Sequence, residues 1–274
     1  MTFQNALLVF FKDWREMKRN WQIVGPIIGV PLLISLVLPL IIVVIPSMLT
    51  MPGTYFNSPI TLITNLPPDV KAQLAGMTAI QMLVFIFAEY FFAPFFLIIP
   101  IMASSVLASD SFAGEKDRKT IEAILATPLT DGELLLGKVL VSFIPSMLVT
   151  FLAFIIYSSV IDLSTFTLFN NTFLLPNLNW IVLILGVTPA VALSGIGITV
   201  IVSLKVKGFR EAQQLSALLV LPVLGLIFAQ IGGALVFGPL MLGLLIFGFV
   251  TLDIIVFYLG IRLFRREEIL TKSI

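Results

Sequence analysis

The sequence contains 38 consecutive residues without a charge, from Leu215 to Leu252. A single helix of that length would extend about 57 Å, whereas the hydrocarbon core of a bilayer is about 30 Å thick. The stretch therefore predicts two apolar helices joined by a turn, and it limits the chain to a membrane protein. The turn is expected among residues that favour a reversal of the chain, which are Gln230, Gly232, Gly233, Gly238 and Pro239.

Long apolar runs bounded by charges or turn residues occur six times, and each is typical of a membrane-spanning helix. They cover residues 23–47, 80–108, 137–160, 180–204, 215–230 and 239–261. Hydrophobic residues make up 59% of the 274 residues and charged residues 11%, against roughly 45–50% and 25% in soluble domains. We predict an all-α polytopic membrane protein whose residues 1–274 form one transmembrane domain. Because the fifth run is short, a half-crossing or re-entrant segment there stays an alternative.

The chain has no cysteine and no histidine. Their absence excludes disulfides, thiolate nucleophiles, Ser-His dyads and the common zinc and haem sites. Six spans also require at least ~120 residues, so the loops leave no room for a separate catalytic domain. The sequence therefore argues against an enzyme, and we expect no catalytic residue, cofactor or metal in this chain.

The basic residues are distributed very unevenly among the loops. Fifteen of the 16 Lys and Arg lie at the two ends and in the loops after the second and fourth spans, and the other loops hold only Lys71. Cytoplasmic loops retain Lys and Arg. We therefore predict a multi-pass protein of the plasma (cell) membrane with both termini in the cytoplasm. Its expected surroundings are the lipid bilayer and not a nucleic acid.

Residues 1–20 have the pattern of an amphipathic helix. The apolar residues at spacings of three and four are Phe3, Leu7, Phe10, Phe11, Trp14 and Met17, and the residues of the opposite face are Lys12, Asp13, Arg15, Glu16, Lys18 and Arg19. We expect an N-terminal interfacial helix on the cytoplasmic side of the membrane. The alternative is a helix that packs on the protein's own cytoplasmic surface.

Prolines interrupt most of the predicted spans, at positions 26, 31, 39, 94, 100, 145, 189 and 222. Each removes a backbone donor and kinks its helix. The carbonyl groups that are freed must then find partners on neighbouring helices or water. This pattern favours a protein with a lumen or with movable walls.

Residues 109–136 form the longest charged segment, expected to be a cytoplasmic loop. A short helix is predicted, with Ile121, Ile124 and Leu125 on one face and with Glu115, Asp117, Arg118 and Lys119 in water. Pro128 ends this helix, and Thr130 with Glu133 forms a capping box that begins the next one. Such a helix is suited to dock into a groove of a soluble partner, although a plain connection between two spans explains it equally well.

The same segment resembles the cytoplasmic loop of type-2 ATP-binding-cassette (ABC) transporter permeases. The family pattern G-E-(x)4-T-x-E-x-x-L-x-x-P-(x)4-E-(x)3-G-K is met by Gly114, Glu115, Thr120, Glu122, Leu125, Pro128, Glu133, Gly137 and Lys138. The loop after the fourth span, SLKVKGFREAQQLSALLVLP, is also similar to the second cytoplasmic loop of the family. The topology of six spans with both ends inside agrees along essentially the whole chain.

The resemblance implies a permease subunit, expected to be an exporter, that forms the substrate pathway as a dimer with a second copy or a homologous permease. It also implies a coupling helix around Gly114–Thr127 that inserts into a cleft of a separate cytoplasmic ATPase subunit, present as a dimer. ATP and Mg would be bound by that partner. The expected coupling residues are Gly114, Glu115, Lys116, Arg118, Thr120, Glu122, Leu125 and Pro128.

A second motif in this region imitates a nucleotide site. Residues 132–139, GELLLGKV, match the G-x-x-x-x-G-K half of a phosphate-binding loop. Val139 stands where that loop requires Ser or Thr, and no strand precedes the motif. We interpret the segment as the beginning of a helix, so this chain is not expected to hydrolyse ATP.

Glu89 and Asp253 are acidic residues inside predicted spans. An ionised carboxylate near the centre of a bilayer costs about 2–3 kcal/mol or more, so each is expected to face the protein interior or a wet cavity. They can bind substrate, relay protons, or stay protonated and join helices by hydrogen bonds, and we expect at least one of them to face the dimer interface or the transport path. The second role supports an alternative function, a secondary transporter driven by an ion gradient. The inverted repeats common in such carriers are not visible in this sequence.

Overall fold

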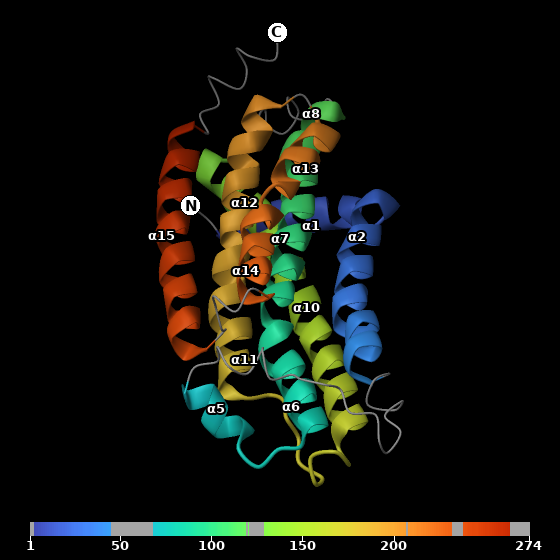
Figure 1. The fold of residues 1–274 in the computed structure, drawn as a ribbon. Coiled ribbons are helices and arrows are strands. Elements are labelled where there is room, and N and C mark those ends of the chain that lie inside the picture. The colour runs from blue at the N-terminus through green and yellow to red at the C-terminus, as the bar shows by residue number, and fades with distance from the viewer. Residues whose placement is uncertain are drawn as a thin grey trace.

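The computed structural model describes residues 3–44, 68–118, 120, 129–206, 208–231 and 238–263. Within these residues the chain forms helices and no strand, in agreement with the all-α prediction (Figure 1). The α-helices are α1 (Phe3–Met17), α2 (Trp21–Leu32), α5 (Pro68–Leu74), α6 (Ala79–Ile86), α7 (Ala93–Ser109), α8 (Glu115–Asp117), α10 (Asp131–Thr165), α11 (Leu178–Val182), α12 (Thr188–Lys205), α13 (Phe209–Ala217), α14 (Val220–Ile231) and α15 (Pro239–Leu263). Wider π-helical turns are η1 (Leu33–Val37), η2 (Leu40–Val44), η3 (Phe87–Phe91), η4 (Asp110–Gly114) and η5 (Leu183–Val187).

Several of these elements join into helices that are long enough to cross a membrane. The described residues contain five such helices, over Ala79–Asp117, Gly132–Thr165, Leu178–Lys205, Phe209–Gln230 and Pro239–Gly260. A sixth is obtained when α1 and the helix Trp21–Val37, which meet at a sharp bend, are counted as one broken span. The second helix does not end at residue 108 as its apolar run does, because η4 and α8 continue it to Asp117. Much of the predicted loop 109–136 is therefore helical.

The N-terminal helix α1 lies across the bundle, at 87° to the helix that follows it (Figure 1). Its buried residues Ala6, Val9, Asp13 and Met17 face the beginning of α10. A Cβ atom at Gly137 would lie 2.7 Å from the carbonyl oxygen of Ala6, so only glycine permits this close crossing. The helix therefore packs on the protein's own surface, while Phe3 and Phe11 stay exposed. Its placement in a membrane interface stays a prediction.

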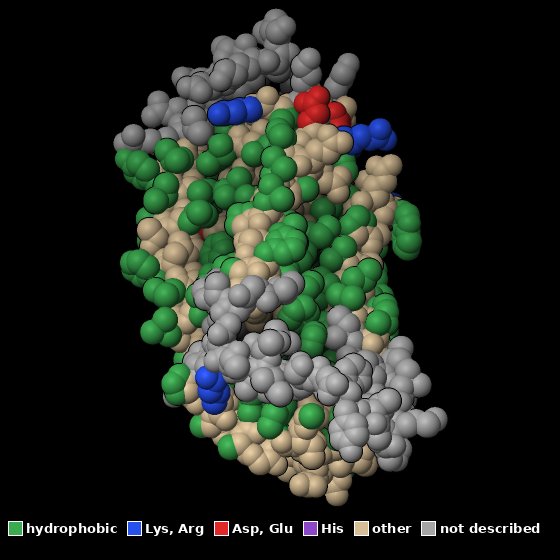
Figure 2. Space-filling model, in the orientation of Figure 1, with side chains coloured by type: hydrophobic (Ala, Val, Ile, Leu, Met, Phe, Trp, Pro, Cys, Tyr) green, Lys and Arg blue, Asp and Glu red, His purple; other side chains and the backbone are tan. Residues whose placement is uncertain are grey.

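Helix α7 lies at the centre of the bundle, where it contacts α2, α10, α12, α13 and α14. Beside it an aromatic cluster fills the core, formed by Phe92, Phe96, Tyr157 and Trp180. The lateral surface is largely apolar, and charged side chains gather at the end where α8 and α13 lie (Figure 2). Large apolar side chains of α15, such as Leu240 and Phe247, are exposed. A bundle with this surface requires an apolar solvent around it.

Proline explains the irregular turn η3. Pro94 has no N–H, so the carbonyl oxygen of Tyr90, four residues earlier, loses its helical partner. The side-chain amide of Gln230 donates to that oxygen at 2.7 Å, and the hydroxyl of Tyr157 donates to the oxygen of Ala88 at 2.7 Å. The expectation that carbonyl groups freed by proline find partners on neighbouring helices is confirmed here. These bonds join η3 to α14 and α10.

Candidate coupling site and buried carboxylates

The predicted coupling residues Gly114, Glu115, Lys116 and Arg118 lie at the end of the long second helix, where η4 passes into α8. The side chains of residues 115–118 make contact with several other parts of the protein. The segment therefore connects the centre of the bundle to α1, α10, α12 and α13.

Glu115 is the most deeply placed of these residues, with only 2% of its surface exposed. Its carboxylate lies 2.6 Å from the ammonium of Lys138 on α10 and 3.1 Å from the ammonium of Lys12 on α1. The expectation that Glu115 remains in water is wrong. The crossing of α1 over α10 covers Glu115, and two cations from those helices compensate its charge. The carboxylate of Glu115 is therefore not exposed, and its burial does not support the assignment of this residue to direct contact with the ATPase.

The same cluster holds a second buried carboxylate, that of Asp13. It accepts a hydrogen bond of 2.8 Å from the hydroxyl of Ser111, and it lies 3.7 Å from the ammonium of Lys138. Lys138 also donates to the carbonyl oxygen of Ser111. Burial lowers the pKa of Lys12, but the charges of Asp13 and Glu115 more than offset it, so the pKa of Lys12 is raised. Both lysines are positioned to stabilise the two carboxylates.

Gly114 and Arg118 form the next layer of the site. The guanidinium of Arg118 donates to the carboxylate of Asp110 at 2.8 Å and lies 3.9 Å from that of Glu16 on α1. A Cβ atom at Gly114 would lie 2.7 Å from the Asp110 oxygen and 3.2 Å from the guanidinium. Burial lowers the pKa of Arg118, but the hydrogen bond and charge of Asp110 dominate and raise it. A larger residue at position 114 would therefore displace the side chains of this ion pair.

Lys116 and Asp117 connect the segment to the other side of the bundle. The ammonium of Lys116 donates to the carbonyl oxygen of Ser203 at 2.7 Å, in the last turn of α12. The carboxylate of Asp117 accepts from the backbone N–H of Phe209 at 2.8 Å, at the beginning of α13. A cation at a helix C-terminus and an anion at a helix N-terminus both complement the helix dipole. These two contacts fix the corner between α12 and α13 to α8.

The structure reaches only part of the predicted docking helix. Thr120 donates through its backbone N–H to the carbonyl oxygen of Glu115 at 3.0 Å. Glu122, Leu125 and Pro128 lie outside the described residues. The predicted capping box is confirmed, because the N–H of Glu133 donates to the Thr130 hydroxyl and the N–H of Thr130 donates to the Glu133 carboxylate.

The residues of the false nucleotide motif have a structural role instead. They lie in the first turns of α10, as expected of a helix. Gly137 provides the close contact with α1, and Lys138 provides the buried cation. Sequence reasoning missed Lys12, Asp13 and Asp110 as partners of the site. The sequence feature that could have pointed to these partners was the Gly137-Lys138 pair, which ends the family pattern.

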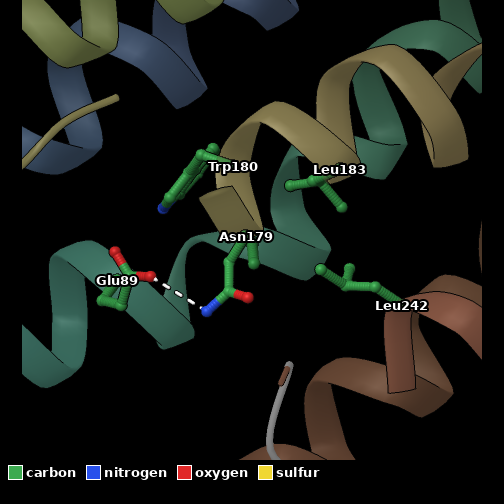
Figure 3. A pocket seen from close by; sticks show the side chains of 6 residues that line it. Glu89, Asn179, Trp180, Leu183 and Leu242 are labelled. Carbon is green, nitrogen blue, oxygen red and sulfur yellow. Dashed lines mark hydrogen bonds between the residues drawn. The ribbon is translucent and has the colours of Figure 1, made fainter. Parts of the chain in front are cut away.

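Glu89 is the first of the two carboxylates within the spans. It lies on η3, is 6% exposed, and accepts hydrogen bonds from the side-chain amides of Asn177 and Asn179. Beside it is a small, partly open recess that admits no water-sized sphere, lined by Glu89, Ala93, Asn179, Trp180, Leu183 and Leu242 (Figure 3). Glu89 is thus surrounded by neutral donors and by apolar and aromatic walls.

Asp253 lies on α15 and is 8% exposed. Its carboxylate accepts a hydrogen bond from the hydroxyl of Ser194 on α12. The ion pairs found among the described residues involve neither Asp253 nor Glu89. Both residues connect helices through neutral partners, but only Glu89 lines the recess described above.

A comparison with protein-family models gives a match over residues 7–242 to the family described as "ABC-2 family transporter protein". The search of curated proteins and the search of solved structures gave no match. The matched range includes the coupling segment and most of the spans. It does not favour the ion-gradient carrier. The chain belongs to the ABC-2 transporter family and is a multi-pass membrane transport subunit of the ABC transporter type.

Proposed function

We propose that the chain is the permease subunit of an ABC exporter, which forms the substrate pathway as a dimer and is driven by a separate cytoplasmic ATPase. The observation that carries the proposal is the set of contacts made by residues 114–118. A short helix that bonds to α1, α10, α12 and α13 cannot move without moving those helices. Force applied at this segment is thereby distributed over the bundle.

The mechanism follows from these contacts. When two ATPase subunits close around ATP and Mg, they displace the coupling helices docked in them. In this chain, Glu115 passes the displacement to α10 and α1 through Lys138 and Lys12. Lys116 and Asp117 pass it to α12 and α13. The spans then alternate between a pathway open to the cytoplasm and one open to the outside.

The orientation that fits this mechanism places α8 and α13 in the cytoplasm. The positive-inside rule supports it, because the loops at that end carry most of the Lys and Arg. Both termini are then cytoplasmic, and the membrane is the plasma membrane. One chain supplies six spans, half of the twelve expected of such a transporter. A second copy or a homologous permease therefore completes the pathway.

Co-purification with the ATPase tests the proposal. The ATPase to test is a soluble chain with a G-x-x-x-x-G-K-[ST] motif, sought in a neighbouring reading frame, and the two chains are expected to form a stable complex. Glu115→Lys is a poor probe of docking, since it disrupts an internal ion pair. Glu122→Lys is the better variant, and Lys71→Glu, in α5 at the opposite end of the bundle, is its matched control.

The expected result is loss of the complex in Glu122→Lys and its retention in Lys71→Glu. The direction of transport is tested in inside-out vesicles, where an exporter accumulates substrate when ATP is added. If the wild-type chain forms no complex with the ATPase, or if Glu122→Lys leaves both the complex and its activity intact, docking through this loop is wrong. Accumulation in right-side-out vesicles loaded with ATP would make the protein an importer.

A further inference from the structure

The N-terminal helix α1 leaves one of its faces uncovered. One face packs on α10, whereas four large apolar side chains on the other side are exposed, those of Phe3, Leu8, Phe11 and Trp14. Phe3 exposes 62% of its surface and Leu8 exposes 67%. A single exposed apolar residue is ordinary, but four within about three turns of one helix form a patch that indicates a partner.

The ion pairs of α1 determine which way this apolar patch points. The ammonium of Lys12 lies 3.1 Å from the carboxylate of Glu115, and the carboxylate of Glu16 lies 3.9 Å from the guanidinium of Arg118. The flank with Lys12 and Glu16 therefore faces α8 and the charged end of the bundle. Trp14 is two positions from each of them, and because each residue turns a helix by about 100°, its side chain lies on the opposite flank. The patch is thus turned toward the spans.

The junction between α1 and α2 indicates the depth of α1. The helix Trp21–Val37 begins a run without charge, and α1 lies across the bundle at 87° to it (Figure 1). Met17 and Ile23, on either side of the turn, are buried in the same apolar cluster and hold the turn in place. Trp21 is 78% exposed, and exposed tryptophan is enriched at the boundary between headgroups and hydrocarbon. These features are typical of a helix at the level of the lipid headgroups.

The end of α1 next to this turn carries three exposed cations, which are Arg15, Lys18 and Arg19. They take part in none of the ion pairs found among the described residues. The acidic residues of α1 do not offset them, because Asp13 and Glu16 lie 3.1 and 3.5 Å from Lys12. Basic residues beside an apolar helix face attract the headgroups of anionic lipids. The uncovered face of α1 therefore complements an anionic lipid in both charge and polarity.

We propose that α1 binds anionic phospholipids of the cytoplasmic leaflet. The lipid phosphates accept hydrogen bonds from Arg15, Lys18 and Arg19, and the acyl chains cover the apolar patch. A soluble protein such as the ATPase can pair with the cations, but it does not reach a patch that is turned toward the spans. The inference rests on the proposed function only for the identity of the leaflet, which depends on the orientation of the charged end.

The test measures which lipid surrounds α1 in nanodiscs that contain the permease alone. The nanodiscs hold equal amounts of phosphatidylcholine and phosphatidylglycerol, with bromine, a quencher of tryptophan fluorescence, on the acyl chains of one lipid or the other. Trp14 and Trp21 report contact with lipid, because the third tryptophan, Trp180, is buried in the core. We expect phosphatidylglycerol to be enriched about fivefold at these two tryptophans, the gain expected of one basic residue near an anionic lipid.

Two matched double variants separate α1 from the rest of the charged end. Arg15→Gln/Lys18→Gln is expected to remove most of the enrichment. Lys205→Gln/Arg210→Gln removes one exposed Lys and one exposed Arg from α12 and α13, and it is expected to retain the enrichment. In about 1 M salt, where the Debye length is about 3 Å, the enrichment in the wild-type protein is also expected to fall.

Equal quenching by the two brominated lipids in the wild-type protein would overturn the proposal, and so would equal losses of enrichment in the two double variants. If Arg15→Gln/Lys18→Gln retains the enrichment and instead loses the complex with the ATPase, these cations contact the ATPase and not lipid. Both leaflets of a nanodisc have the same composition, and no ATPase is present in the quenching assay. Failure of the proposed function therefore does not alter the lipid result.

Discussion

The ammonium group of Lys138 lies 2.6 Å from the carboxylate of Glu115, and both side chains are buried. The two residues belong to different helices, α10 and α8, and Lys12 and Asp13 of α1 complete the cluster. Three segments that are distant in sequence are thus held at one point. In the proposed mechanism, the displacement caused by the ATPase is passed to the bundle at this pair.

Removal of the cation from this cluster is expected to destabilise the protein strongly. Lys138→Met leaves the buried carboxylate of Glu115 without its closest compensating charge and leaves that of Asp13 with Lys12 alone, which costs about 3–5 kcal/mol. The thermal unfolding of the purified protein in detergent measures the loss. Arg210→Met, which removes an exposed cation of α13 that forms none of the ion pairs given above, is the control and should unfold near the wild-type temperature.

The double variant Lys138→Met/Glu115→Gln separates the ion pair from packing. Neutralising Glu115 removes one of the uncompensated charges, so the double variant is expected to be more stable than Lys138→Met. If the losses of stability from the two single substitutions add up in the double variant, Lys138 and Glu115 do not stabilise the protein as an ion pair. The interpretation of residues 114–118 as one connected unit would then be lost.

Gly137 gives a prediction about the position of α1. In Gly137→Ala, the new methyl group would meet the backbone of Ala6 at 2.7 Å, so α1 must shift as a whole. We expect a loss of about 1–3 kcal/mol in the free energy of unfolding. Gly225→Ala in α14 has open space around its Cβ position and should be neutral or stabilising, because alanine favours a helix. Equal effects of the two substitutions would argue against the close crossing.

These residues show how far local patterns predict the structure. The capping box of Thr130 and Glu133, and the helical role of residues 132–139, depend on neighbours a few positions away, and both were predictable. The burial of Glu115 depends on Lys12, which is 103 positions away in the sequence. A charged residue in a charged segment predicts exposure, and only the crossing of α1 over α10 reverses that expectation.

The carboxylates within the spans show the same limit. Their positions in apolar runs predicted that Glu89 and Asp253 are buried, and the cost of a charge in the bilayer explains why each has partners. The difference between them was not predictable. Asn177 and Asn179 follow a connection between two spans, and nothing in their sequence indicates that they reach Glu89. Pairing between spans is decided by helix packing, which periodicity alone does not contain.

Asp162 is a structural carboxylate that the sequence did not single out. Its Oδ1 atom accepts hydrogen bonds from the backbone N–H groups of Leu174 and Leu175, at 2.9 and 3.1 Å. Asp162→Ala leaves both donors without this partner and is expected to cost about 1–3 kcal/mol. Asp162→Asn retains an acceptor oxygen and should cost less. If thermal unfolding shows equal losses for the two variants, the hydrogen bonds are not what Asp162 contributes.

A substitution of Lys116 separates two roles of the coupling segment, which are docking of the ATPase and transmission of its movement to the spans. Its ammonium bonds to the carbonyl oxygen of Ser203 and connects α8 to α12, whereas it is not needed for the contact of Glu115 with α10. Lys116→Gln is therefore expected to keep the complex with the ATPase but to lower the amount of substrate exported per ATP hydrolysed. Lys205→Gln, which removes an exposed cation from the same turn of α12, is the matched control and should keep the wild-type ratio. Transport and ATP hydrolysis measured in the same proteoliposomes give this ratio. Loss of the complex in Lys116→Gln would assign Lys116 to docking of the ATPase. An unchanged ratio of transport to ATP hydrolysis would show that the bond to α12 does not transmit the movement of the ATPase.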